Sequence, residues 1–256
     1  MVNMDPRIQE RRIEILRAKG KRRLRFVLLA ISLLLLTLGG VVVTKSSLLD
    51  VDRIIINGVD GEFAALVEEQ SNIRKSIPLL EVNSSRALRE IKKIPQIKSA
   101  RINKSFNGTL TITVTTRTPV VATSDGSAWL LLDEEGRVVD RILELPFGYP
   151  VIEGIDQPLL MGEWVSEQVL PAIELAMDLP PILAANISSV QIGEMLELNL
   201  FGEGKVLFGD GSSQNEKILA AATILEKADL DNLIHIDVRA PRNPVLCRSR
   251  DCSYAS

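Results

Sequence analysis

The sequence predicts an α+β protein held by a single N-terminal transmembrane helix. Residues 26–44 form a 19-residue run without a charged side chain. Residues 110–115 alternate apolar side chains with threonine, which is the period of a half-buried strand. Residues 62–70 and 84–93 instead carry apolar side chains at helical spacing. The apolar run is therefore followed by helices and strands in a mixed order.

The run at 26–44 has the length of a membrane-spanning helix. At 1.5 Å per residue it spans roughly 28 Å, close to the hydrocarbon thickness of a bilayer. A cleaved signal peptide is the alternative, but its apolar region is about 7–15 residues long and precedes a small-residue cleavage site. Here the run leaves through Thr44-Lys45 without an A-x-A pattern. We therefore expect an uncleaved anchor.

Charge is distributed unevenly around this run. Residues 1–25 hold nine Lys or Arg and three acidic residues, and only Lys45 follows the run closely. The positive-inside rule then predicts a basic cytoplasmic tail, a single-pass type II protein in the cytoplasmic membrane, and an outer part at residues 45–256. The chain beyond residue 25 holds 21 basic and 30 acidic residues, a net charge of −9. Such an acidic body argues against nucleic acid as a partner.

The segment after the anchor predicts a small module in the order β-α-α-β-β, with its helices on one face of a three-stranded sheet. Asn57-Gly58 ends the first strand, and Ser84 is a possible cap of the second helix, which stops before Pro95. Asn107-Gly108 is a strong hairpin signal between the last two strands. The expected elements are a strand at 51–57, helices at 62–70 and 84–93, and strands at 97–104 and 109–117.

Pro119 marks the beginning of a second, β-rich module, because proline cannot donate to a sheet ladder. Apolar spacing in this module predicts both strands and helices. The expected elements are strands near 120–123 and 127–132, a helix at 166–178, a hairpin at 194–209, a helix at 214–227, and strands at 233–239 and 244–248.

The order of elements behind an anchor resembles the POTRA domain of the bacterial cell-division family FtsQ/DivIB. Five segments carry the resemblance: VDRIIINGVDG (51–61), IPLLEVNSSRALREIKKIPQIKSARINKSFNGTLTITVTTRTPVV (77–121), DEEGRVVD (133–140), GDGSSQNEKILAAATIL (209–225) and HIDVRAPRNPV (235–245). The resemblance implies a POTRA domain at 45–118. It also implies a β domain at 119–248 that extends the POTRA sheet, and a C-terminal tail at 249–256.

The same resemblance implies a non-enzymatic division protein at the septum. Such a protein recruits the bitopic partners FtsB and FtsL, and through them the septal peptidoglycan synthases. The residues that match the family's FtsB-docking region are Val245, Leu246, Cys247 and Arg248, and Arg239 matches its closing D-l-R motif. If this last strand lies at a sheet edge, a partner strand can be added to it. The alternative is that these residues complete the core and that the tail 249–256 covers the edge.

No catalytic, cofactor-binding or metal-binding residues are expected, and no small-molecule substrate. Gly202-Glu203-Gly204-Lys205 lacks the spacing of a phosphate-binding loop and fits a hairpin turn. His235, the only histidine, fits a structural side chain in a strand. Asp133, Glu134 and Glu135 form an acidic cluster that we interpret as a solvated turn. The alternatives to a division scaffold are a membrane-anchored hydrolase or peptidase, and a POTRA protein that serves protein translocation.

Cys247 and Cys252 are the only cysteines. On the outer side of the membrane they can form a disulfide or remain free thiols, and the sequence does not choose between the two. A metal site is disfavoured, because the single histidine lies 12 residues away from Cys247.

Overall fold

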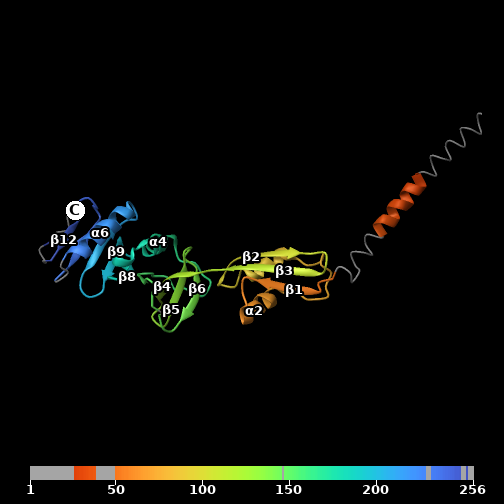
Figure 1. The fold of residues 1–256 in the computed structure, drawn as a ribbon, viewed down its shortest axis with the longest axis horizontal. Coiled ribbons are helices and arrows are strands. Elements are labelled where there is room, and N and C mark those ends of the chain that lie inside the picture. Colours follow the sequence, from red (N-terminus) through yellow and green to blue (C-terminus); the bar gives the residue numbers. More distant parts are fainter. Residues whose placement is uncertain (1–25, 39–49, 146, 229–231, 249–251, 253–256) are drawn as a thin grey trace, which may run out of the picture. The chain divides into compact units, whose positions relative to one another are not determined.

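The computed structural model describes residues 26–38, 50–145, 147–228, 232–248 and 252 (Figure 1). The described residues fall into two compact units, one within Met1–Leu88 and Arg101–Thr113 and the other within Arg89–Ala100 and Val114–Ser256. Residues 26–38 are helical. Among the helices described, none combines the length and the apolar character needed to cross a membrane. The basic tail and residues 39–44 of the expected anchor lie outside the described residues.

The first sheet has the POTRA order of elements. Its strands are β1 (Arg53–Asn57), β2 (Ile97–Lys104) and β3 (Thr109–Thr116), and β3 lies in the centre. β1 runs parallel to β3, in a register that pairs Ile54 with Leu110. A parallel pair needs a crossover connection, which helices α2 (Gly61–Ser71) and α3 (Ser84–Ile91) provide. The β-α-α-β-β prediction is confirmed.

The second unit holds two further sheets. One is the antiparallel sheet β4 (Pro119–Ser124), β5 (Trp129–Asp133) and β6 (Val138–Ile142). The other has six strands in the order β12-β11-β10-β9-β8-β7, with parallel pairs at β10–β11 and β7–β8. Its strands are β7 (Ile152–Glu153), β8 (Ile187–Gln191), β9 (Leu196–Leu200), β10 (Lys205–Gly209), β11 (His235–Asp237) and β12 (Val245–Cys247).

One apolar core joins these two sheets to their helices. The helices are η2 (Glu167–Val169), α4 (Leu170–Asp178), α5 (Pro181–Ala184) and α6 (Gln214–Lys227). On α6, Ile218, Ala221 and Leu225 are buried in this core, as their spacing predicts. Each large apolar side chain that is fully buried contributes about 1.5–3 kcal/mol.

The second module does not continue the ladder of the first sheet. None of the described strands after β3 pairs with β1, β2 or β3. The expectation that the β domain extends the POTRA sheet is therefore wrong for the strand pairing of this part of the chain. β3 ends at Thr116, and Pro119, the first residue of β4, takes Asp133 of β5 as its register partner. A proline has no N–H for a ladder bond, so the chain leaves one sheet before it enters the next.

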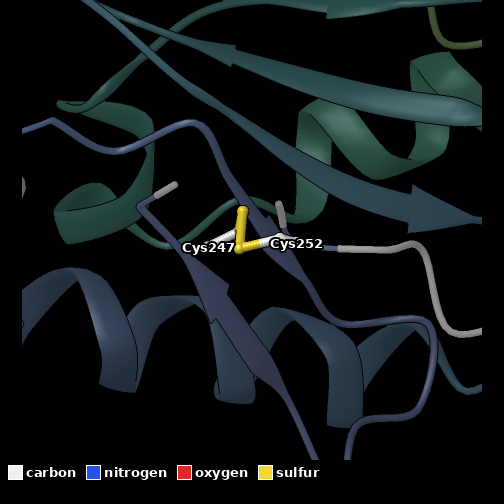
Figure 2. Close-up of a disulfide and its surroundings, with 2 residues drawn as sticks. All are labelled: Cys247 and Cys252. Carbon is white, nitrogen blue, oxygen red and sulfur yellow. A yellow bond between two sulfur atoms is a disulfide. The ribbon is translucent and has the colours of Figure 1, made fainter. Parts of the chain in front are cut away.

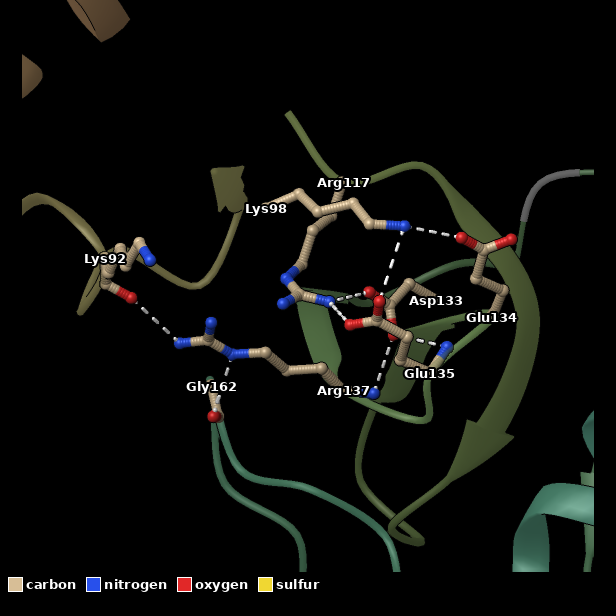
Figure 3. A network of polar contacts seen from close by, with 8 residues as sticks. All are labelled: Lys92, Lys98, Arg117, Asp133, Glu134, Glu135, Arg137 and Gly162. Carbon is tan, nitrogen blue, oxygen red and sulfur yellow. Dashed lines mark hydrogen bonds and ion pairs between the residues drawn. The ribbon is translucent and has the colours of Figure 1, made fainter. Parts of the chain in front are cut away.

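A network of charged side chains surrounds the end of β3 (Figure 3). Arg117 donates to Asp133 and, at 2.9 Å, to Glu135. The Arg117 guanidinium also lies 4.9 Å from the centre of the Trp164 ring. The side chain of Asp133 is only 3% exposed. The interpretation of 133–135 as a solvated turn is therefore wrong for Asp133, because its buried charge is compensated by Arg117, and it holds for the more exposed Glu134 and Glu135.

Candidate functional site

β12 lies at one end of the six-stranded sheet and pairs with β11 on one side. Among the described strands, no other pairs with it. Its register places Val245 opposite Asp237, Leu246 opposite Ile236, and Cys247 opposite His235. Among the described strands, β12 is therefore an edge strand, as the binding of an added strand requires.

The register determines which main-chain groups face the open side of β12. The Val238 N–H donates to the Leu207 carbonyl of β10 at 3.1 Å. Because alternate residues of a strand direct their N–H and C=O to the same side, Ile236 also faces β10, whereas His235 and Asp237 face β12. Their register partners, Cys247 and Val245, then bond towards β11. Leu246 is left with its N–H and C=O directed away from the sheet.

The side chains of β12 alternate between the two faces of the sheet. Leu246 packs against the core beneath the sheet. Val245 therefore points to the opposite face, where half of its side chain is exposed (50%). Cys247 shares this face but is buried, and Arg248 follows the strand and is exposed. A strand added at this edge would thus meet apolar side chains on both faces.

Arg239 follows β11 and lies outside β12. Its backbone N–H and its Nε both donate to Oδ1 of Asp237 at 3.0 Å, and its side chain also donates to Oδ2 at 2.6 Å. These bonds hold the pKa of Asp237 below its ordinary value, because they favour the ionised carboxylate. Arg239 therefore fixes the turn that leaves β11 and leads to β12.

A disulfide joins Cys247, the last residue of β12, to Cys252 (Figure 2). It resolves the choice that the sequence left open between a disulfide and free thiols. The two Cα atoms are 5.9 Å apart, whereas five residues of extended chain span about 17 Å. The disulfide therefore holds Cys252 close to the end of β12.

A shallow pocket of about 310 Å³ lies beside Arg239 and was not predicted. Its other residues come from β8, the β8–β9 turn, β9 and β10, and they include Glu194, Met195 and Leu207. The pairing of β8 with β9 and of β9 with β10 brings them together. Only the strand order could have indicated this pocket, because the sequence alone does not place β8 beside β9.

The residues considered for other chemistry lie in a hairpin and in a buried strand. Gly202, Glu203 and Gly204 lie in the turn between β9 and β10, as predicted, and Lys205 begins β10. His235 is buried in β11. Within the residues that the structure describes, no group of three His, Cys, Asp or Glu side chains is placed to hold a metal ion.

Comparison with known proteins points to one family. Residues 49–117 match the family model described as "POTRA domain, FtsQ-type". The chain is 27% identical over 239 residues to "Cell division protein FtsQ" of Streptomyces collinus. This alignment covers 89% of this chain and 90% of that protein. These matches support the FtsQ/DivIB family.

Further relatives point to the same FtsQ/DivIB family. "Cell division protein FtsQ" of Streptomyces griseus is 25% identical over 209 residues, covering 80% of this chain and all of that protein. "Cell division protein DivIB" of Brevibacillus brevis is 29% identical over 179 residues, covering 69% of this chain and 64% of that protein. The relatives indicate a cell division protein, which is consistent with the POTRA sheet and the β-rich second unit.

Proposed function

We propose that this chain is a non-enzymatic, single-span scaffold of the division septum. It recruits an FtsB-type bitopic protein by adding a strand of that partner to β12. FtsL and the septal peptidoglycan synthases join through this partner. The similarity to the FtsQ/DivIB family supports the role in division, and the open side of β12 supports the mode of binding.

The anchor in this proposal is residues 26–44, with the basic tail in the cytoplasm. The described residues 26–38 support it, because they are helical and their apolar side chains are exposed to the surroundings of the helix. A bilayer would bury these side chains, and the nine basic residues of the tail would stay on the cytoplasmic side.

The observation that carries the proposed binding mode is the direction of the Leu246 main chain. An N–H and a C=O on the open side of an edge strand are the groups that an added strand bonds. Val245 on one face and Leu246 on the other supply apolar contacts that fix the register of the added strand. Asp237 and Arg239 hold the turn before β12 and so keep the edge in place.

The test is a binding titration of the full chain, in a non-ionic detergent, with the outer segment of FtsB from the same organism. Leu246→Pro removes the outward N–H and part of the side-chain packing. Leu246→Ala is the matched control, because it loses the packing and keeps the N–H. We expect Leu246→Pro to bind roughly tenfold more weakly than Leu246→Ala, because it leaves a partner carbonyl without a donor, while circular dichroism shows the parent and both variants folded.

Two outcomes would overturn the binding mode. In one, Leu246→Pro and Leu246→Ala weaken binding equally, which would assign the effect to the side chain. In the other, the parent does not bind the segment, which would exclude this edge as the site for that partner and leave the family assignment unchanged.

A further inference from the structure

We propose that a groove between the β5–β6 turn and helix α4 binds a positively charged, amphipathic segment of a partner protein. The groove has a volume of about 470 Å³. The turn contributes Glu134 and Glu135, and α4 contributes Leu170, Glu174, Met177 and Asp178. None of these residues belongs to β12 or to the turn before it, so the groove is a second surface of the same unit.

Helix α4 presents a mixed apolar and acidic face. Its buried residues are Ala172, Ile173, Leu175 and Ala176. The exposed side follows the spacing of Leu170, Glu174 and Met177, four and then three residues apart, which places them on one face of the helix. Leu170 and Met177 keep 37% and 44% of their surface exposed. The helix therefore leaves an apolar strip uncovered beside a carboxylate.

Gly136 allows the β5–β6 turn to pack closely against Leu170 at the start of this helix. A Cβ atom at Gly136 would lie 2.5 Å from Cγ2 of Val165 and 3.0 Å from Cδ2 of Leu170. The Val165 N–H also donates to the Gly136 carbonyl at 2.9 Å. Because the glycine has no side chain, the turn lies against Leu170, and Glu134 and Glu135 form one wall of the groove.

The two acidic residues of the turn already have cationic partners. Lys98 donates to Glu134 at 2.5 Å, and Arg117 donates to Glu135 at 2.9 Å (Figure 3). These contacts hold the wall of the groove in place. Glu174 has no ion-pair partner among the described residues, and Asp178 accepts one hydrogen bond, at 3.0 Å, from the amide of Gln214. The uncompensated negative charge of the groove therefore lies on α4.

The end of α4 adds to this negative charge. Asp178 is the last residue of the helix, and the last turn carries no basic residue. The C-terminal carbonyls of a helix carry a partial negative charge, so an acidic residue there is locally unfavourable. Violations of such local rules are expected at functional or strained sites. A lysine or arginine from outside would satisfy Glu174, Asp178 and the last carbonyls together.

The charge and the apolar surface of the groove together determine which kind of segment can bind there. Leu170 and Met177 need an apolar side chain to cover them, and methionine adapts to many shapes. Glu174 and Asp178 need a cation, which excludes acidic partners by repulsion. The occupant is therefore a segment of protein in which apolar residues alternate with Lys or Arg.

The experiment uses the full chain in a non-ionic detergent and a fluorescein-labelled synthetic peptide, acetyl-KLAKKLAK-amide, followed by fluorescence anisotropy. Glu174→Gln with Asp178→Asn removes the two carboxylates of α4. Glu69→Gln with Glu226→Gln removes two exposed carboxylates elsewhere and is the charge-matched control. We expect the first pair to weaken binding roughly fivefold and the control pair to change it less than twofold.

The apolar strip is tested with Met177→Ser and with the peptide acetyl-KAAKKAAK-amide, each of which should also weaken binding. Leu246→Pro should leave the affinity for the peptide unchanged, so that failure of the β12 proposal and failure of this one are distinguishable. Equal weakening by the two carboxylate pairs would overturn the proposal, because net charge alone would explain it. Absence of binding to the parent would overturn it as well.

Discussion

Arg117 and Asp133 form an ion pair in which 6% and 3% of the two side-chain surfaces remain exposed. The pair links the residue after β3 to the last residue of β5. Arg117 also lies over the ring of Trp164, which Arg137 approaches at 5.6 Å. Because both side chains are buried, the charge of Arg117 or Asp133 is compensated only while the other residue of the pair is present.

Arg117→Met should therefore destabilise the second unit by about 3–5 kcal/mol, because it leaves the buried carboxylate of Asp133 without its cation. Lys98→Met is the control, since its pair with Glu134 is exposed to solvent and should contribute little to stability. Urea unfolding of the full chain in detergent measures both. Similar losses for the two variants would contradict a special role of the buried pair.

Gly136→Ala should cost about 2–4 kcal/mol, because the new Cβ meets Val165 and because φ is +80°. Gly126→Ala separates the two causes, since Gly126 has a φ of +85° and open space around it. That variant should lose only the backbone term, about 1–2 kcal/mol. Thermal unfolding measures the difference, and equal losses would show that the close approach to Val165 is unimportant for stability.

The pH dependence of stability should reveal the contact between Asp237 and Arg239. The folded-state pKa of Asp237 is lowered, so its contribution is present above the unfolded value of about 3.9 and is lost as the pH falls through the folded pKa. Arg239→Gln should raise the pKa of Asp237 and remove this contribution. Its stability should therefore converge with that of the parent at acid pH.

Carboxyl-carbon NMR titration measures that shift directly. Asp210 serves as an internal control, because bonds from Ser212 and Lys217 hold its pKa at about 2 and do not involve Arg239. A change in Asp237 alone supports the local contact. A change in both carboxylates would point to a wider rearrangement in the variant.

Cys252→Ala should lower the stability of the second unit by about 2 kcal/mol, because the disulfide closes a short loop of the unfolded chain. For a unit of this size the Tm should fall by several degrees. Dithiothreitol should lower the Tm of the parent and leave that of the variant unchanged. A parent that is insensitive to the reductant would contradict a disulfide that stabilises the fold.

Much of the fold follows from local periodicity. The alternation at Leu110, Ile112 and Val114 predicted β3, and the prediction of a helix at 214–227 coincides with α6. β8 was not predicted, because a bulge between Ile187 and Ser189 breaks its alternation. The two residues of β7 and the four of α5 are too few to show a period.

The candidate sites depend more on contacts between distant residues. The sequence placed Leu246 in a last strand, but only its register with Ile236 shows which groups face outward. The burial of Asp133 follows from Arg117, a partner 16 residues away, which composition does not indicate. The groove joins a turn at residue 134 to a helix that begins at Leu170, and this pairing was not predicted at all.

The length of β12, three residues that end at the disulfide-bonded Cys247, limits what a partner can gain from its backbone. Only Leu246 directs its two main-chain groups outward, so an added strand gains about 1–3 kcal/mol from hydrogen bonds. Micromolar affinity requires about 8 kcal/mol. Side-chain contacts beyond the strand must supply the remainder. The backbone of β12 would thus align a partner, and the surrounding surface would determine how long that partner remains bound.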